Sequence, residues 1–140
     1  TVHLVLGPST QAIPQNTQLT VHRVVSAQDM YEACNRVFAD VDIAILSAAV
    51  ADFTPANVAN EKIKKDQAAL SVTLQPTIDI LKTLGAAKTN QFLVGFALET
   101  NNEEANALKK LASKNADAIV LNSLNDAGAG FGTDTNQVQI

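Results

Sequence analysis

Short apolar segments alternate with segments of helical character along most of the chain, and this alternation restricts the fold more than any other feature. Five segments are rich in Val, Ile and Leu, as β-strands are: residues 2–6, 19–25, 42–50, 92–98 and 118–121. Three segments with helical features lie between them: residues 26–38, 77–84 and 105–114. Strands separated by helices predict a three-layer, Rossmann-like α/β fold, in which helices cover both faces of an open, mostly parallel sheet.

Capping residues mark the ends of the predicted helices. Ser26 is a good N-cap, and Asp29 three residues later favours the positive end of a helix. An apolar stripe at helical spacing follows: Met30, Ala33, Cys34, Val37 and Phe38. Thr77 is predicted to cap the second helix and Gly85 to end it. The inner face of the third helix is predicted to hold Ala105, Leu108, Leu111 and Ala112.

Three further stretches depart from this pattern. Residues 42–50 are almost continuously apolar, which is typical of a central parallel strand covered on both faces. Residues 54–75 have no clear period and are predicted to form a loop or lid, with a short strand at 71–74. The last residues, 136–140, are predicted to form an edge strand.

Composition narrows the class of protein. The 140 residues fit one domain, 1–140, and 46% apolar with 17% charged residues suffices to bury a core. A net charge of −4 argues against a nucleic-acid or anionic-membrane partner. The single cysteine excludes an internal disulfide and a cysteine-rich zinc site. Since no leader and no membrane-spanning run is visible, a cytoplasmic location is expected.

Three predicted strand ends are unusual, at residues 48–52, 95–100 and 121–122, and the first two hold small residues. Ligands of open α/β sheets bind outside the carboxyl ends of the strands, where small side chains would let a flat ring reach the backbone N–H and C=O groups. Close helix–sheet packing also selects Ala and Gly, and composition alone favours that explanation. Asp52, at the first of these ends, could bind a ligand hydroxyl or amine, or be a loop residue or a cap.

Two groups of lysines could meet phosphate. The segment 61–65 reads EKIKK, which is either a solvated face or a cationic lid that neutralises phosphate oxygens. Lys110 and Lys114 lie four apart and share one helix face. They either favour the negative end of that helix or form a second cationic wall.

Other candidates are weaker. The GAGFG segment at 128–132 resembles a dinucleotide-binding loop but leaves no room for the helix that should follow it. Cys34 lies on the apolar stripe and is predicted to be an inert core thiol. His3 and His22 lie in strand patterns without a partner at metal-ligand spacing, so neither is assigned a role.

Together, these segments resemble the phosphopantothenate–cysteine ligases of coenzyme A biosynthesis, of the bacterial type. The resemblance covers almost the whole chain in family order, and AAVADF, KIKK and VGFA-ET together form a specific signature. Its elements are LVLGP at 4–8, SAQDM at 26–30, AAVADFTP at 48–55, EKIKK at 61–65, IDIL at 78–81, VGFALET at 94–100, the pair Lys110 and Lys114, and IVLN at 119–122.

The resemblance implies a ligase that uses CTP, with Mg²⁺ as counter-ion, to join 4′-phosphopantothenate to L-cysteine through an acyl-cytidylate. Lys62 would be the catalytic residue, which contacts phosphate and promotes conversion of that intermediate. The resemblance further implies a homodimer that pairs partly through the lid region. The nucleotide-binding residues that it implies are Leu46, Ser47, Ala48, Asp52, Lys62, Ile78, Asp79, Ile80, Leu81, Phe96, Lys110 and Lys114.

The sequence differs from the family pattern in two respects. Members normally begin with a strand and a glycine-rich turn, which also supplies an asparagine tied to the intermediate, and longer members continue beyond the position of Val138. The chain is therefore expected to be incomplete at both ends and to lack a central strand. Thr54 stands where many members have arginine.

Two other functions remain open. The first is a nucleotide-binding or assembly module without turnover on the same fold. The second is a Rossmann-like oxidoreductase, which is disfavoured because no glycine-rich phosphate loop follows the first strand.

Overall fold

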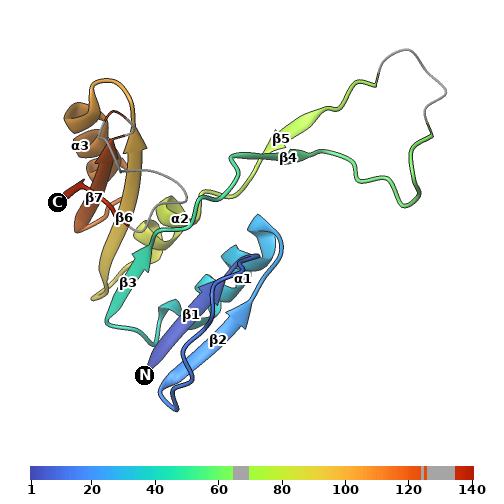
Figure 1. Cartoon of the computed structure of the whole chain (residues 1–140). Helices are drawn as coiled ribbons and strands as arrows, with labels where there is room; N and C mark the ends of the chain where they lie inside the picture. The colour runs from blue at the N-terminus through green and yellow to red at the C-terminus, as the bar shows by residue number, and fades with distance from the viewer. Residues whose placement is uncertain (65–69, 124, 126–134) are drawn as a thin grey trace.

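The computed structural model describes residues 1–64, 70–123, 125 and 135–140 (Figure 1). Strands and helices alternate over most of this range, which confirms the predicted α/β class. The elements are β1 (Val2–Leu6), β2 (Leu19–Arg23), α1 (Ala27–Phe38), β3 (Ile43–Leu46), β4 (Phe53–Pro55), β5 (Leu74–Pro76), α2 (Ile80–Ala87), β6 (Phe92–Glu99), α3 (Glu103–Ser113), β7 (Ala118–Ser123) and β8 (Val138–Gln139).

The described strands form three sheets. The largest has the order β3-β6-β7-β8, in which β3, β6 and β7 are parallel and β8 pairs antiparallel to β7, as an edge strand. Strands β1 and β2 form a separate parallel pair. Strands β4 and β5 form a short antiparallel ribbon. The predicted single sheet is thus divided in two in the described residues, with β1 and β3 each at an edge.

The predicted cap of α1 is confirmed as a capping box. The Asp29 backbone N–H donates to the Ser26 hydroxyl at 3.0 Å, and the Ser26 N–H donates to the Asp29 carboxylate at 2.9 Å. Hydrogen bonds from the backbone and side chain of Ser26 and from the Val25 N–H lower the pKa of Asp29. The predicted stripe is also found, because Ala33 and Phe38 are buried and Cys34 packs against the core.

The predicted bounds of α2 were wrong at both ends. Asp79, not Thr77, is the N-cap, and its carboxylate accepts from the Lys82 N–H at 2.9 Å. Gly85 does not end the helix but lies inside it, where a Cβ would meet the Lys114 carbonyl oxygen at 1.8 Å. This glycine is therefore required for the close approach of two segments rather than for a helix stop.

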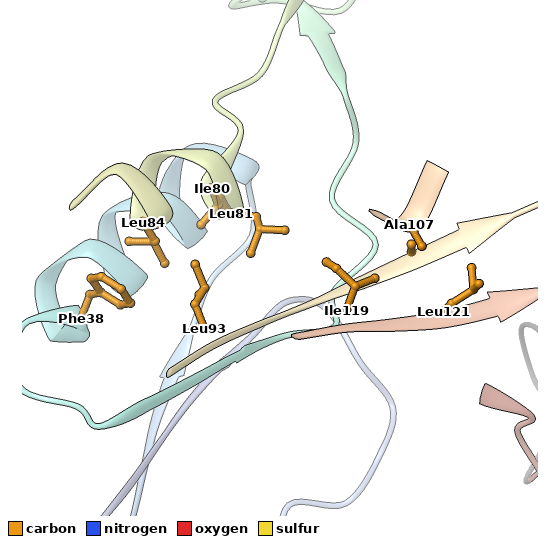
Figure 2. Close-up of a cluster of buried hydrophobic side chains, with 9 residues drawn as sticks. Phe38, Ile80, Leu81, Leu84, Leu93, Ala107, Ile119 and Leu121 are labelled. Atoms are coloured by element: carbon orange, nitrogen blue, oxygen red, sulfur yellow. The ribbon is translucent and has the colours of Figure 1, made fainter. Parts of the chain in front are cut away.

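The core lies on one face of the four-stranded sheet, between its strands and the three helices (Figure 2). Leu84 and Leu93 are the most deeply buried side chains, at 1% and 0% exposure. On the opposite face of β3, Ile43 and Ile45 are about three-fifths exposed, and β3 ends at Leu46. The prediction of a long strand at 42–50 covered on both faces was therefore wrong for the described structure.

The inward face of α3 also differs from the prediction. Ala107 is buried and Leu111 packs against the core, but the predicted inner residues Ala105, Leu108 and Ala112 are exposed. The face that turns inward carries Lys110 and Lys114, whose ammonium groups bind partners across the fold. The helix is thus oriented by its cations as well as by its apolar residues.

Residues 53–64 and 70–76 form an arm that projects from the rest of the molecule (Figure 1). The β4–β5 ribbon forms its base, and the Ala56 N–H donates to the Thr73 carbonyl beyond it, at 2.9 Å. The predicted strand at 71–74 is found slightly later, as β5. The predicted lid is therefore an extended arm in this structure.

Candidate functional site

The carboxyl ends of β3 and β6 place several predicted residues at one edge of the sheet. Leu46, the last residue of β3, pairs in register with Gly95, and Phe96 follows on β6. Ser47 and Ala48 leave β3 exposed to solvent. This edge is where open α/β sheets bind their ligands.

Thr77 holds the chain that leaves this edge against the start of α2. Its hydroxyl donates to the Ala51 carbonyl at 2.6 Å, and its N–H donates to the Asp52 carbonyl at 2.9 Å. Sequence reasoning treated Thr77 only as a helix cap and missed this role. A threonine two residues before a capping aspartate gave no signal for a contact 26 residues away in sequence.

The N-terminus of α2 contributes a charged group to the same region. One carboxylate oxygen of Asp79 caps the helix, and the other binds the Lys114 ammonium in an ion pair. The Asp79 side chain is 45% exposed and that of Lys114 is 22% exposed, so the pair is accessible from solvent. The structure thereby brings together two residues that lie 35 positions apart.

Lys110 lies beside this pair. Its ammonium donates to the Phe96 carbonyl at 2.7 Å, and its charge acts on Asp79. Four predicted residues, Asp79, Phe96, Lys110 and Lys114, are therefore connected through two lysine contacts. Two ammonium groups next to the positive end of a helix form an arrangement suited to an anion such as phosphate.

The pKa of Asp79 reflects this environment. Desolvation is the largest single effect and raises it. The hydrogen bonds from Lys114 and from the Lys82 N–H, together with the charges of Lys114 and Lys110, outweigh desolvation and lower the pKa below its ordinary value of 3.8. Asp79 is therefore ionised at neutral pH and holds Lys114 in place.

Other predicted residues are placed differently. Ile80 and Leu81 are buried in the core, so only their backbone could contact a ligand, whereas Ile78 is 39% exposed. The Asp52 side chain is exposed beside the base of the arm. Lys62 is exposed and belongs to the projecting arm, and among the described residues no hydrogen bond or ion pair connects it to the site at α3.

The small residues at the strand ends have two different explanations. At Gly95 the packing explanation holds, because a Cβ there would meet Leu81 at 2.6 Å and Ile119 at 2.9 Å. The alanines at 48, 49 and 51 are exposed instead. Helix packing therefore does not account for them, and the ligand explanation stays open at this strand end.

Candidates outside this edge are structural or untested. The His3 Nδ1 and His22 Nε2 atoms lie 3.1 Å apart in stacked rings on β1 and β2, a pairing that sequence spacing did not reveal. Burial raises the pKa of the Cys34 thiol, in keeping with a core residue. Lys65 and the GAGFG segment at 128–132 lie outside the described residues. Across those described, no three His, Cys, Asp or Glu side chains form a group that could hold a metal.

Comparison with known proteins gives this geometry a context. The family model for the DNA/pantothenate metabolism flavoprotein C-terminal domain matches residues 1–140. The chain belongs to this family. It is 53% identical over 117 residues to the coenzyme A biosynthesis bifunctional protein CoaBC of Bacillus subtilis (strain 168), which covers 84% of the chain and 29% of that protein.

Two further relatives match nearly the whole flavoprotein C-terminal domain. A cysteine/cysteine sulfinic acid decarboxylase from an unknown prokaryotic organism is 52% identical over 99% of the chain and 39% of that protein. The CoaBC protein of Vibrio vulnificus (strain YJ016) is 38% identical over 99% of the chain and 35% of that protein. The chain thus spans about two fifths or less of the length of these curated relatives.

Solved structures agree with the fold of the domain. The C-terminal domain of a CoaBC protein has a TM-score of 0.71 at 44% identity, over 84% of the chain and 54% of that structure. The DNA/pantothenate metabolism flavoprotein of Streptococcus pneumoniae has a TM-score of 0.76 over 98% of the chain and 72% of that structure, and at 20% identity it supports the fold alone. Among the described residues, no helix is long and apolar enough to cross a membrane.

Proposed function

We propose that this domain acts in coenzyme A biosynthesis as a ligase that joins 4′-phosphopantothenate to L-cysteine at the expense of CTP. The observation that carries the proposal is the cluster of Asp79, Lys110 and Lys114 at the ligand-binding edge of the sheet. Relatives named as coenzyme A biosynthesis proteins over nearly the whole chain support the same function.

The proposed reaction has two steps. A carboxylate oxygen of phosphopantothenate attacks the α-phosphorus of CTP, the bond to the β-phosphate breaks, and pyrophosphate leaves. The cysteine amine then attacks the acyl carbon and loses a proton, and CMP leaves as the amide forms. Both steps need cationic groups near the phosphates, because negative charge must be compensated at the phosphate oxygens in each of them.

The described residues suit parts of this task. Lys110 and Lys114 would hold the phosphates, and the exposed backbone at Leu46, Ser47 and Ala48 would receive the base. Lys114 is now held by Asp79, so a phosphate at this ammonium would share or replace that contact. Thr77, through its two bonds to residues 51 and 52, would keep the base-binding segment next to the helix that carries Asp79.

Magnesium would enter with the nucleotide. Mg²⁺ keeps several waters and is usually bound through substrate phosphates and one or two carboxylates, so it needs no cage of protein ligands. Bound in this way, the ion would supply charge compensation to the triphosphate.

A homodimer through the arm is also part of the proposal. The arm exposes apolar side chains that a monomer would leave in water, among them Val58, Ile63, Leu70 and Val72 at 55–80% exposure. They line a groove of about 400 Å³. Pairing of two arms would bury these side chains, which the hydrophobic effect favours.

The test is an assay of the protein with CTP, 4′-phosphopantothenate, cysteine and Mg²⁺. We expect pyrophosphate and the amide product in equal amounts. The matched control is Lys109→Ala, because Lys109 is an exposed neighbour of Lys110 on α3 whose side chain has no hydrogen bond or ion pair to the described residues. Lys110→Ala should reduce kcat/KM for CTP at least tenfold, roughly the effect of losing one charged contact, and Lys109→Ala should not.

The second candidate is a nucleotide-binding module without turnover. The internal engagement of both lysines favours it, because each ammonium already has a partner. The same assay separates the two functions. CTP binding without release of pyrophosphate would support the module, and pyrophosphate release without amide would indicate that only the first step occurs.

A further inference from the structure

The acidic turn between β6 and α3 has no role in the ligand-binding function proposed above. It contains Glu99 and Thr100, the last residues of the VGFALET motif, and Glu103, the first residue of α3. In the structure its carboxylates accept hydrogen bonds from side chains of α3 and from side chains at the end of β7.

Glu103 connects the start of α3 to the end of β7. One oxygen, Oε1, accepts from the Ser123 hydroxyl at 2.5 Å and from the Asn125 amide at 2.9 Å. Ser123 is only 7% exposed, and its hydroxyl also accepts from the Asn125 N–H at 3.0 Å. The Asn125 amide further donates to the Thr100 carbonyl at 3.1 Å, which closes the network on the turn itself.

The same helix face continues to the two lysines. Residues 103, 107, 110 and 114 follow at steps of four, three and four, which is the spacing of one helix face. Ala107 on this face is buried. Therefore Glu103 at the start of α3, Lys110 in its last turn and Lys114 at its C-cap all bind partners on the same side.

We propose that Glu103 is a positioning residue, whose hydrogen bonds to Ser123 and Asn125 fix α3 on the sheet so that Lys110 and Lys114 face the nucleotide. This inference rests on the proposed function. A helix that loses its hydrogen bonds to the sheet at one end can shift or rotate on that sheet. Shifts of about 1 Å at binding groups can reduce rates by up to about 100-fold. Glu103 itself does not touch the nucleotide in this account.

Substitutions at Glu103 can separate hydrogen bonding from charge. Both bonds end on Oε1, so Glu103→Gln keeps an acceptor in the same place and removes only the negative charge. Glu103→Ala removes both. Glu104 is the matched control, because it is the next residue on α3, is exposed, and its side chain has no hydrogen bond to the part of the chain that the structure describes. The two glutamates also lie equally near the positive end of the helix.

The experiment measures CTP affinity by calorimetry, KM and kcat, and hydrogen exchange of α3 amides in the protein. We expect Glu103→Ala to weaken CTP binding about tenfold and to speed exchange over residues 103–114. Glu103→Gln should restore both readouts to within about twofold, and Glu104→Ala should change neither. Ser123→Ala, which removes one of the two donors, should give a smaller loss, and combining it with Glu103→Ala should add nothing further.

The outcomes decide between the two proposals. Unchanged CTP affinity in Glu103→Ala, in a protein that otherwise binds CTP, overturns the positioning role alone. Glu103→Gln as weak as Glu103→Ala also overturns it, because charge rather than hydrogen bonding would then be responsible. Failure of the unaltered protein to bind CTP overturns the ligase proposal as well. If Glu103→Ala does not fold, Ser123→Ala carries the test, and its unchanged affinity overturns the inference.

Discussion

Replacement of Gly85 by alanine tests the closest contact between segments of this fold. Gly85 lies inside α2, so helix propensity alone predicts that Gly85→Ala stabilises the protein by about 1 kcal/mol. The structure predicts instead that the substitution destabilises the protein. A Cβ at this position would lie 1.8 Å from the Lys114 carbonyl oxygen, and the obstacle is backbone rather than a side-chain end that could rotate away.

The size of the effect follows from the movement required. Relief of the clash needs a separation of about 3.4 Å, the lower limit of an ordinary contact, so α2 and the end of α3 must move apart. Overpacking of this kind usually costs about 1–3 kcal/mol. The movement also breaks the hydrogen bond from the Asn115 amide to the Gly85 carbonyl, at 2.8 Å, which is worth about 1 kcal/mol. After the gain in propensity, we expect the free energy of unfolding to fall by roughly 1–3 kcal/mol.

Urea unfolding followed by circular dichroism measures this change. Gly7→Ala is the control, because a Cβ there meets only the Met30 methyl group at 3.7 Å, and we expect a change within about 0.5 kcal/mol. Ala86→Gly, at an exposed position of the same helix, should lower stability by about 1 kcal/mol through propensity alone. A Gly85→Ala protein as stable as the unaltered one, or more stable, would refute the packing argument.

Three further predictions concern the site and the core. Ala48→Leu should abolish CTP binding but leave the unfolding midpoint unchanged, as calorimetry and urea unfolding would show, and unchanged CTP affinity would exclude the base site at this strand end. Leu84→Ala should lower the free energy of unfolding by about 2–5 kcal/mol, because the side chain is 1% exposed and its removal leaves a cavity; a loss below about 1 kcal/mol would contradict the core described above. The lowered pKa of Asp79 means that its ion pair stabilises the fold above the ordinary value of 3.8 and that this part is lost as the pH falls through the lower folded-state pKa. In Asp79→Asn, the free energy of unfolding should therefore depend less on pH below about pH 4. An unchanged pH dependence in this range would show that the ion pair does not contribute to stability.

The sequence was sufficient to predict the alternation of elements and most of the residues at the sheet edge. Strand β6, the capping box at Ser26 and the edge strand near Val138 follow from patterns within a few residues of one another. Such patterns depend on local geometry, which sequence reasoning captures well. The pairing of Asp79 with Lys114 could not be predicted in this way, because it depends on where α2 and α3 lie relative to each other.

The errors have a common cause, which is that tertiary contacts outweighed local signals. Gly85 has the residue type of a helix stop, but the Lys114 carbonyl occupies the space where its side chain would be. Thr77 has the residue type of a cap, but its hydroxyl binds the Ala51 carbonyl instead. In both cases the local preference was real, and a partner more than 25 residues away in sequence determined the outcome.

The orientation of α3 differs from the one that its apolar residues predict, and its lysines face the fold instead. The apolar pattern alone predicts that Leu108 faces inward. Leu108 is instead 58% exposed, and Lys110 and Lys114 point into the fold. Long lysine side chains can lay their methylene groups along apolar surface and carry the ammonium to a polar partner, so lysines on an inner face need not disrupt packing. Because the helix places its two lysines inward, the apolar side chain of Leu108 stays in contact with water. Apolar burial alone does not explain this orientation, and the inward lysines fit the anion binding proposed for the sheet edge.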